Sequence, residues 1–297
     1  MRHSKIQWKE IPLPSGAAVT LSRILAEARV IPENPGFITG HFDLTRHLAV
    51  SPRLFFKKIR PSGSGFEYHD LICELFCSRL ASRLSLPVPA CIPLEVPGVG
   101  FGLLSSLVGK QTMTSVAQEA IVNADRLSAM FVFEQLMLNV DDKPDHFRVR
   151  ELPDGKYEFF VVDHGHTLHA WRAELQDPAT LDSSPTLLLP SSPQNEYRIL
   201  NYGQLVANVR DLGARVVEST PPVLSEVFHE LQESQMGDPG LQRAFAERPK
   251  HETIISKIIQ IRAKALDQIV RLKCQQANIR IDPEQTFVSM VGVGASQ

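Results

Sequence analysis

The clearest pattern of apolar and polar residues lies near the middle of the chain. An apolar run at residues 131–138 is long enough for a buried helix. A polar segment at 139–146 follows it and predicts a loop. Residues 147–162 then contain two strand-like segments around a Pro-Asp-Gly turn, and the second segment is rich in aromatic and β-branched residues. The pattern therefore predicts a helix, a loop and a β-hairpin that ends at Asp163.

Strand and turn signals dominate the part of the chain before this centre. Residues 53–60 alternate as a strand does, and a broad apolar stripe from residue 66 predicts a helix that Leu86-Pro87-Val88-Pro89 terminates. Gly36 and Gly40 predict a plain hairpin, because their spacing matches no phosphate-binding glycine motif. Two further strands are predicted at 91–96 and 100–104.

Helical spacing of apolar residues returns in the second half of the chain. The pair Pro221-Pro222 is typical of the first turn of a helix, so it predicts a helix boundary there. Residues 171–203 are rich in Pro, Ser and Asp and predict a long irregular insertion or cap. The predicted helices lie at 116–127, 203–217, 221–233 and 251–275. The chain as a whole is therefore predicted to be an α+β protein.

Composition and charge narrow the class of protein. Of the 297 residues, 43% are hydrophobic and 22% are charged, as in an ordinary soluble globular protein. The net charge of −2 gives no global signal for nucleic-acid binding, and the four cysteines predict core packing rather than a disulfide framework. No apolar stretch approaches the ~20 residues of a membrane span, and the first residues lack a signal peptide's apolar core. We therefore expect a cytoplasmic protein without a membrane segment.

Candidate chemistry is concentrated in the central loop and at the end of the hairpin. The loop contains three carboxylates, Asp141, Asp142 and Asp145, together with an amide and an imidazole. The hairpin would bring Asp163 beside them. Carboxylates close to the end of a buried helix suit a site for a metal ion and a phosphate.

These two segments resemble the motifs of the HipA-like kinase family. The family's catalytic loop is similar to Asn-x-Asp-Arg followed, after three residues, by Asn, and here Asn139-Val140-Asp141-Asp142 is followed by His146. The family's metal aspartate commonly stands in Ile-Asp-His-Gly, and Val162-Asp163-His164-Gly165 is similar to it. The resemblance implies a two-lobed, protein-kinase-like fold, with a strand-rich N-terminal lobe at 1–108 and a mainly helical C-terminal lobe at 109–297.

The resemblance also implies roles for individual residues. Asp141 would be the catalytic base, and Asn139 would brace the loop by hydrogen bonds. Asp163 would bind Mg²⁺, and His146 would occupy the second metal-ligand position. ATP and Mg²⁺ would be the cofactors. The substrate would be a Ser or Thr hydroxyl of a protein, with a lipid or small-molecule hydroxyl left open.

A lysine and a glutamate upstream are similar to the family's nucleotide-binding pair. Strand alternation places Lys57 and Lys58 on opposite faces, and Lys58-Ile59-Arg60 matches the family's phosphate-contacting lysine best, with Lys57 as the second choice. Glu74, on the predicted helix, would form the ion pair that aims the lysine at the phosphates. The alternatives are an edge strand with solvated lysines and a surface glutamate.

Departures from the family pattern leave two other functions open. Asp142 stands where Arg is usual and His146 where Asn is usual, and imidazole suits Zn²⁺, Mn²⁺ or Fe²⁺ better than Mg²⁺. These departures, with the missing glycine loop, allow a pseudokinase that binds a nucleotide or a partner. The density of Asp and His allows a metal-dependent hydrolase, in which His164 and His166 would share one face of a strand.

Overall fold

The computed structural model places most of the strands and helices that the sequence predicts. Asp141, Asp142 and residues 171–201 of the predicted insertion lie outside the residues that it describes. Those residues are 11–12, 18–19, 29–32, 39–43, 54–59, 68–96, 100–106, 109, 111–139, 144–168, 202–234, 242 and 245–276.

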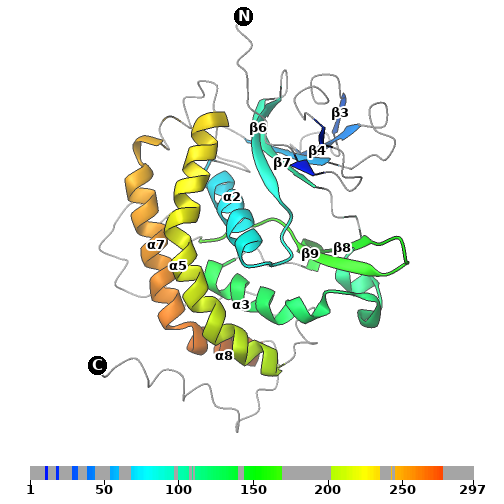
Figure 1. Cartoon of the computed structure of the whole chain (residues 1–297), viewed down its shortest axis with the longest axis vertical. Helices are drawn as coiled ribbons and strands as arrows, with labels where there is room; N and C mark the ends of the chain where they lie inside the picture. The colour runs from blue at the N-terminus through cyan, green and yellow to red at the C-terminus, as the bar shows by residue number, and fades with distance from the viewer. Residues whose placement is uncertain are drawn as a thin grey trace, which may run out of the picture.

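An antiparallel sheet of five strands forms one side of the molecule (Figure 1). Its order is β3 (Arg29–Pro32), β4 (Thr39–Asp43), β5 (Leu54–Lys58), β7 (Gly100–Ser106) and β6 (Cys91–Val96). The pairing of β3 with β4 confirms the predicted hairpin. Strand β5 is therefore central, with a neighbour on each side.

Two short strands and a tight approach complete this part of the fold. Strands β1 (Ile11–Pro12) and β2 (Ala18–Val19) pair with each other. Strands β5 and β7 approach closely at Gly102, where a Cβ atom would overlap the carbonyl oxygen of Lys57. A glycine is therefore required beside the strand that carries Lys57.

Helix α2 (Tyr68–Arg83) lies between the sheet and the helical part of the molecule (Figure 1). Its apolar stripe is buried as the sequence predicts, and its residues belong to the same core cluster as Ile59, Phe101 and Leu103 from the sheet. The helix ends where Ser85 adopts a positive φ of 56° and the amide of Leu86 donates to the carbonyl of Ala81. The predicted helix and its terminator are both confirmed.

Helix α3 (Leu127–Met137) is buried along its whole length, as its apolar sequence predicts. The predicted helix at 116–127 is wrong, because this segment contains only the short 3₁₀ turns η2 (Gln118–Ala120) and η3 (Ala124–Arg126), which follow a first such turn, η1 (Met113–Ser115). The Asn123 side chain donates to the carbonyl of Phe159 at 3.0 Å and accepts from its amide at 2.9 Å. Pairing with the hairpin thus replaces helical hydrogen bonding here.

The predicted boundary at Pro221-Pro222 is also wrong. Helix α5 (Tyr202–Ser234) runs through both prolines. Both proline side chains are exposed, and neither proline has an amide hydrogen to donate to the carbonyls of Val217 and Glu218 one turn earlier. The predicted helix at 251–275 is instead two helices. These are α7 (Arg248–Lys264) and α8 (Leu266–Gln276).

The central hairpin is confirmed and lies against the helical part. It consists of η4 (Pro144–His146), β8 (Phe147–Glu151) and β9 (Tyr157–Val161), with Phe147 opposite Val161. Its buried residues join one hydrophobic cluster with α2, α3, α5 and α7. The strand-rich and helical parts therefore share a core, which fixes the elements that meet at the candidate site.

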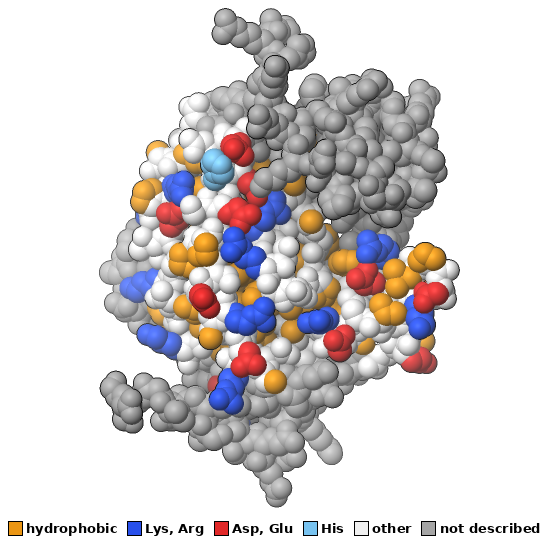
Figure 2. Space-filling model, in the orientation of Figure 1, with side chains coloured by type: hydrophobic (Ala, Val, Ile, Leu, Met, Phe, Trp, Pro, Cys, Tyr) orange, Lys and Arg blue, Asp and Glu red, His pale blue; other side chains and the backbone are white. Residues whose placement is uncertain are grey.

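The described surface carries charges of both signs. Figure 2 shows acidic and basic side chains interspersed over the described part of one face, without a broad field of either sign. Within the described helices, none is both long enough and apolar enough to cross a membrane.

Candidate functional site

An ion pair joins the sheet to the end of the central hairpin. Nζ of Lys57 on β5 donates to Oδ1 of Asp163 at 2.6 Å, and both side chains are half-buried. Lys57 lies on the strand face that also carries Ile59, whose side chain is in the core cluster with α2. Lys58, the first choice from the sequence, is on the opposite face of the strand. The structure thus brings Lys57, the second choice, to Asp163.

The backbone turns sharply at Asp163. This residue has a φ of 65°, in the left-handed region that Asp tolerates better than most residues. It stands two residues beyond β9, where the amide of Val162 donates to the carbonyl of His146 at 2.9 Å. The turn aims the carboxylate away from the strand and toward Lys57.

Carboxylates surround Lys57. Burial disfavours its ammonium form, but the charges of Glu74, Asp163 and Asp70 outweigh burial and raise the pKa of Lys57. Burial would raise the pKa of Asp163, but Lys57 and the nearby His146 hold it well below its ordinary range. Lys57 and Asp163 are therefore both charged near neutral pH, and the carboxyl groups of Glu74 and Asp70 lie close enough to favour the charged form of Lys57.

Glu74 reaches this site from α2. Burial raises the pKa of its carboxyl group, while the Lys57 ammonium lowers it. Its Oε2 atom is buried and has no hydrogen-bond partner among the described residues. Glu74 is therefore electrostatically linked to Lys57 and retains acceptor capacity for a further donor or cation.

His146 lies beside Asp163, whereas Asp141 cannot be placed. The Nε2 atom of the buried His146 is 3.8 Å from Oδ2 of Asp163. Asp141 is outside the described residues, so its distance from either group is not defined. The structure thus brings together Lys57, Glu74, His146 and Asp163.

A buried glutamate, Glu134, connects the segment that follows Asp163 to the start of the central loop. The sequence analysis did not single it out. Oε1 of Glu134 on α3 is 2.7 Å from Nε2 of His164, the residue after Asp163. Its Oε2 accepts from Nδ2 of Asn139, the first residue of the loop, at 2.6 Å. The sequence signal is a lone carboxylate within an otherwise apolar helix, because a buried charge needs partners.

A buried arginine holds the end of the same helix. Nε of Arg262 on α7 donates to the carbonyls of Gln135 and Leu136 at 3.0 and 3.1 Å, and its Nη2 also donates to Gln135. Burial lowers the pKa of this guanidinium to about 10. Leu138 then takes a left-handed φ of 50° and leads into the loop. Arg262 therefore fixes the direction in which α3 enters the loop.

Cysteines of α2 hold the segment that follows Asp163. The thiol of Cys73 donates to the carbonyl of Thr167 at 3.4 Å, and Sγ of Cys77 is 3.5 Å from its Oγ1. Burial raises the pKa of Cys77 well above its ordinary value, so this thiol stays protonated. The predicted packing role of the two cysteines agrees with these contacts.

The grouping that the hydrolase alternative requires is not found in the described part of the chain. His164 and His166 follow β9 in a turn rather than lying on a strand, and His164 faces Glu134. No three His, Cys, Asp or Glu residues are grouped as metal ligands among the residues described. Asp141, Asp142 and His169 lie outside them.

The His164–Glu134 pair predicts a pH dependence of stability. Burial disfavours protonated His164, but the charge and hydrogen bond of Glu134 outweigh it and raise the pKa of His164 above 6.5. The folded protein therefore binds this proton more tightly than the unfolded chain. The stabilisation is complete below pH 6.5 and is lost as the pH rises through the raised pKa.

Urea unfolding measures this loss. The protein and its His164→Gln variant are compared across pH 6 to 9 in a buffer that contains EDTA. The difference in unfolding free energy should shrink as the pH rises. The lowered pKa of His251 is common to both proteins and cancels in the comparison. A difference that stays constant or grows with pH would contradict the assignment.

Comparison with known structures places the fold. The crystal structure of the proinflammatory kinase CtkA from Helicobacter pylori aligns over 86% of this chain and 98% of that chain, with a TM-score of 0.50 and 8% identity. A chain from the Shewanella oneidensis MR-1 complex of HipA, HipB and operator DNA aligns over 77% of this chain and 61% of that chain, with a TM-score of 0.35 and 12% identity. No protein-family model and no curated protein sequence matches the chain.

At 8% identity, the likeness to CtkA concerns the fold and not the reaction. The five-stranded sheet with α2 and the helical part with the central hairpin are the two parts that the sequence predicts. The protein-kinase-like fold that the resemblance implies is therefore confirmed. The chain has the two-lobed α+β fold of a kinase-like protein.

Proposed function

We propose that the chain is an ATP-dependent kinase that transfers a phosphoryl group to a hydroxyl, with a Ser or Thr side chain of a protein as the substrate. The ion pair between Lys57 and Asp163 carries this proposal. It joins a lysine of the sheet to a carboxylate of the hairpin, and phosphoryl transfer needs such a cation and such a metal ligand in one place. The kinase-like fold and the description of CtkA as a kinase support the same activity.

The charges of the site suit ATP with Mg²⁺. Asp163 is held in its charged form beside Lys57, so an anionic metal ligand and a cation for phosphate oxygens stand next to each other. Mg²⁺ keeps several waters and uses one or two carboxylates together with substrate phosphates. Asp163 and the adjacent His146 would hold the metal, and the imidazole makes Mn²⁺ worth testing in parallel.

Each residue of the site then has a separate task. Lys57 would donate to phosphate oxygens, and Glu74 would hold the lysine in that direction. Asp141 would accept the proton of the attacking hydroxyl, while the bond from Asn139 to Glu134 supports a bracing role for Asn139. The metal ion, when bound, would neutralise the charge on the transferred group.

A pseudokinase is the second candidate, favoured by two residues of the loop. Asp142 replaces the usual Arg, and the buried His146 stands beside Asp163 where Asn is usual. Such a protein would bind Mg–ATP without turning it over. Parallel measurements of ATP binding and ATP turnover, with Asp141→Ala as the comparison, separate the two. Turnover that Asp141→Ala abolishes supports the kinase, and binding with no turnover supports the pseudokinase.

Lys57→Met should weaken Mg–ATP binding by roughly 10- to 100-fold, since a hydrogen bond to a charged group contributes about 1.5–3 kcal/mol. Lys58→Met is the matched control, because it removes the same group from the neighbouring residue on the opposite face. It should change the affinity by no more than about twofold, as substitutions outside such contacts usually do. Isothermal titration calorimetry measures both affinities.

Thermal unfolding of both variants shows whether each remains folded at the temperature of the titration. An equal loss for Lys57→Met and Lys58→Met, or a larger loss for Lys58→Met, would contradict the assignment of Lys57. A folded protein that binds no Mg–ATP would contradict both the kinase and the nucleotide-binding pseudokinase.

A further inference from the structure

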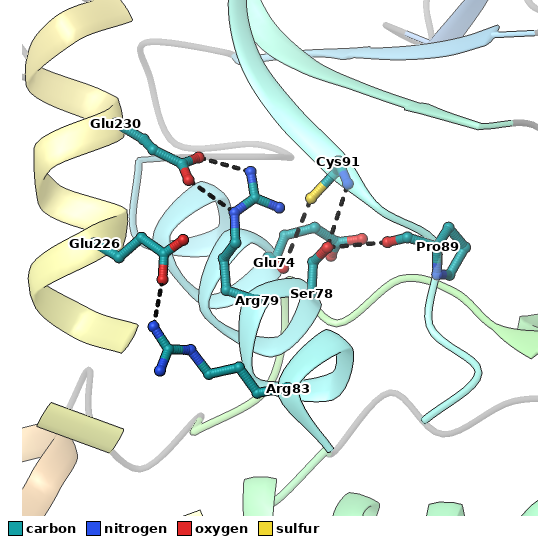
Figure 3. A network of polar contacts seen from close by, with 8 residues as sticks. All are labelled: Glu74, Ser78, Arg79, Arg83, Pro89, Cys91, Glu226 and Glu230. Carbon is teal, nitrogen blue, oxygen red and sulfur yellow. Dashed lines mark hydrogen bonds and ion pairs between the residues drawn. The ribbon is translucent and has the colours of Figure 1, made fainter. Parts of the chain in front are cut away.

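Two arginine–glutamate pairs tie α2 to α5. Arg79 donates from Nε to Oε1 of Glu230 at 2.9 Å and from Nη2 to Oε2 at 2.6 Å (Figure 3). One turn further along α2, Nη2 of Arg83 donates to Oε2 of Glu226 at 2.8 Å. Since the later residue on α2 meets the earlier residue on α5, the two helices run antiparallel. The two ion pairs therefore connect α2, which packs on the sheet, to α5 in the helical part.

The two ion pairs differ in burial and geometry. The side chains of Arg79 and Glu230 are only 16% and 11% exposed, whereas those of Arg83 and Glu226 are 46% and 35% exposed. The Arg79 pair is also bidentate, which fixes the direction of the guanidinium as well as its distance. An exposed pair with a single bond contributes little. The Arg79–Glu230 pair therefore holds the helix, and the Arg83–Glu226 pair provides a matched control.

The same helix carries Glu74, just over one turn before Arg79. Ser78 Oγ accepts from the amide of Cys91 at 3.2 Å and donates to the carbonyl of Pro89 at 3.0 Å, so α2 is also bonded to the start of β6 (Figure 3). Cys91 Sγ lies 3.9 Å from the backbone oxygen of Glu74. Because a helix is stiff over one turn, rotation of α2 at Arg79 would move Glu74 with it.

We propose that Arg79, bonded to Glu230, is a positioning residue that fixes the rotation of α2 and so holds Glu74 beside Lys57. Arg79 contacts α5 rather than Lys57 or Asp163, so it acts through the helix. This inference deepens the proposed function and rests on it for the consequence in ATP turnover. The placement of Lys57 that it requires can be measured without any nucleotide.

The test compares Arg79→Gln with Arg83→Gln, which makes the same change in the exposed ion pair. Acylation of Lys57, followed by mass spectrometry of its peptide in the absence of nucleotide, reports how firmly the amine is held. Arg79→Gln should acylate several-fold faster than the unsubstituted protein, and Arg83→Gln at the same rate. Turnover by Arg79→Gln should fall by up to ~100-fold, as for a displacement of about 1 Å in an active site, with KM for ATP raised.

Exchange of the two charges, Arg79→Glu with Glu230→Arg, should restore the slow acylation of Lys57. If Arg79→Gln does not fold, Arg79→Lys and the exchange variant carry the test, and Arg79→Lys should acylate at an intermediate rate. Equal rates for Arg79→Gln and Arg83→Gln, or a lowered melting temperature with unchanged Lys57 reactivity, would overturn the proposal. Failure of the unsubstituted protein to bind Mg–ATP would refute the proposed function, whereas the acylation rates would still decide the role of Arg79.

Discussion

Asp163→Asn should abolish metal-dependent ATP turnover, with a loss of at least about 1,000-fold. The substitution removes the carboxylate that bonds to Lys57 at 2.6 Å and that we propose as the principal metal ligand. Asn also tolerates the left-handed conformation, so the φ of 65° at this position can be retained. Charge stabilisation by a metal ion contributes several kcal/mol, and each ~1.4 kcal/mol is tenfold in rate. Turnover is measured at several concentrations of Mg²⁺ and Mn²⁺.

Asp154→Asn is the matched control, since Asp154 is an exposed residue in the turn of the same hairpin. Its turnover should equal that of the unsubstituted protein. If the unsubstituted protein binds ATP without turnover, Asp163→Asn should instead eliminate the metal dependence of binding. Retention of metal-dependent turnover or binding by Asp163→Asn would remove Asp163 from the metal site.

Glu134→Ala should lower the free energy of unfolding by about 3–5 kcal/mol, the usual cost of removing one partner from a buried charged pair. His164 would lose its 2.7 Å contact, and Asn139 would lose its 2.6 Å acceptor in the same step. Both residues adjoin the proposed catalytic groups, so ATP turnover should fall together with stability. Urea unfolding near pH 6, where His164 is protonated, measures the change.

Glu158→Ala provides the comparison for this loss. Glu158 pairs with Arg150 on the outer part of the hairpin, at 2.5 Å, and both side chains are substantially exposed. Because exposed ion pairs contribute about 0–1 kcal/mol, this variant should be close to the unsubstituted protein. A loss at Glu134 no larger than the loss at Glu158 would show that the buried bridge does not stabilise the site.

The sequence predicts the local elements well where one pattern dominates. The apolar stripe of α2, the apolar run of α3 and the turn of the central hairpin each fix an element without help from distant residues. The segment at 116–127 departs from prediction because Asn123 bonds to the backbone of Phe159, a partner distant in sequence. Helix α5 continues through Pro221 and Pro222 although neither can donate a helical hydrogen bond, so the local proline signal does not decide the helix boundary.

The candidate site is harder to predict, since it depends on which face of each element is buried. Alternation separates Lys57 from Lys58 but cannot say which face packs on α2, and tertiary packing selects Lys57. Glu134 has partners 5 and 30 residues away, so only the fold shows that one carboxylate serves both. Motif resemblance indicates Asp163 and His146 more directly, because their segments are short and continuous.

The buried bond from Arg262 to the end of α3 has a consequence for dissecting the protein. The carbonyls of Gln135 and Leu136 receive their donors from a residue 126 or 127 positions later in the chain. A fragment that stops before α7 would leave those acceptors without the guanidinium, just where the chain enters the loop that carries Asp141. The sheet, α2 and the hairpin therefore do not form a complete site on their own, and a shortened version of this protein must keep α7.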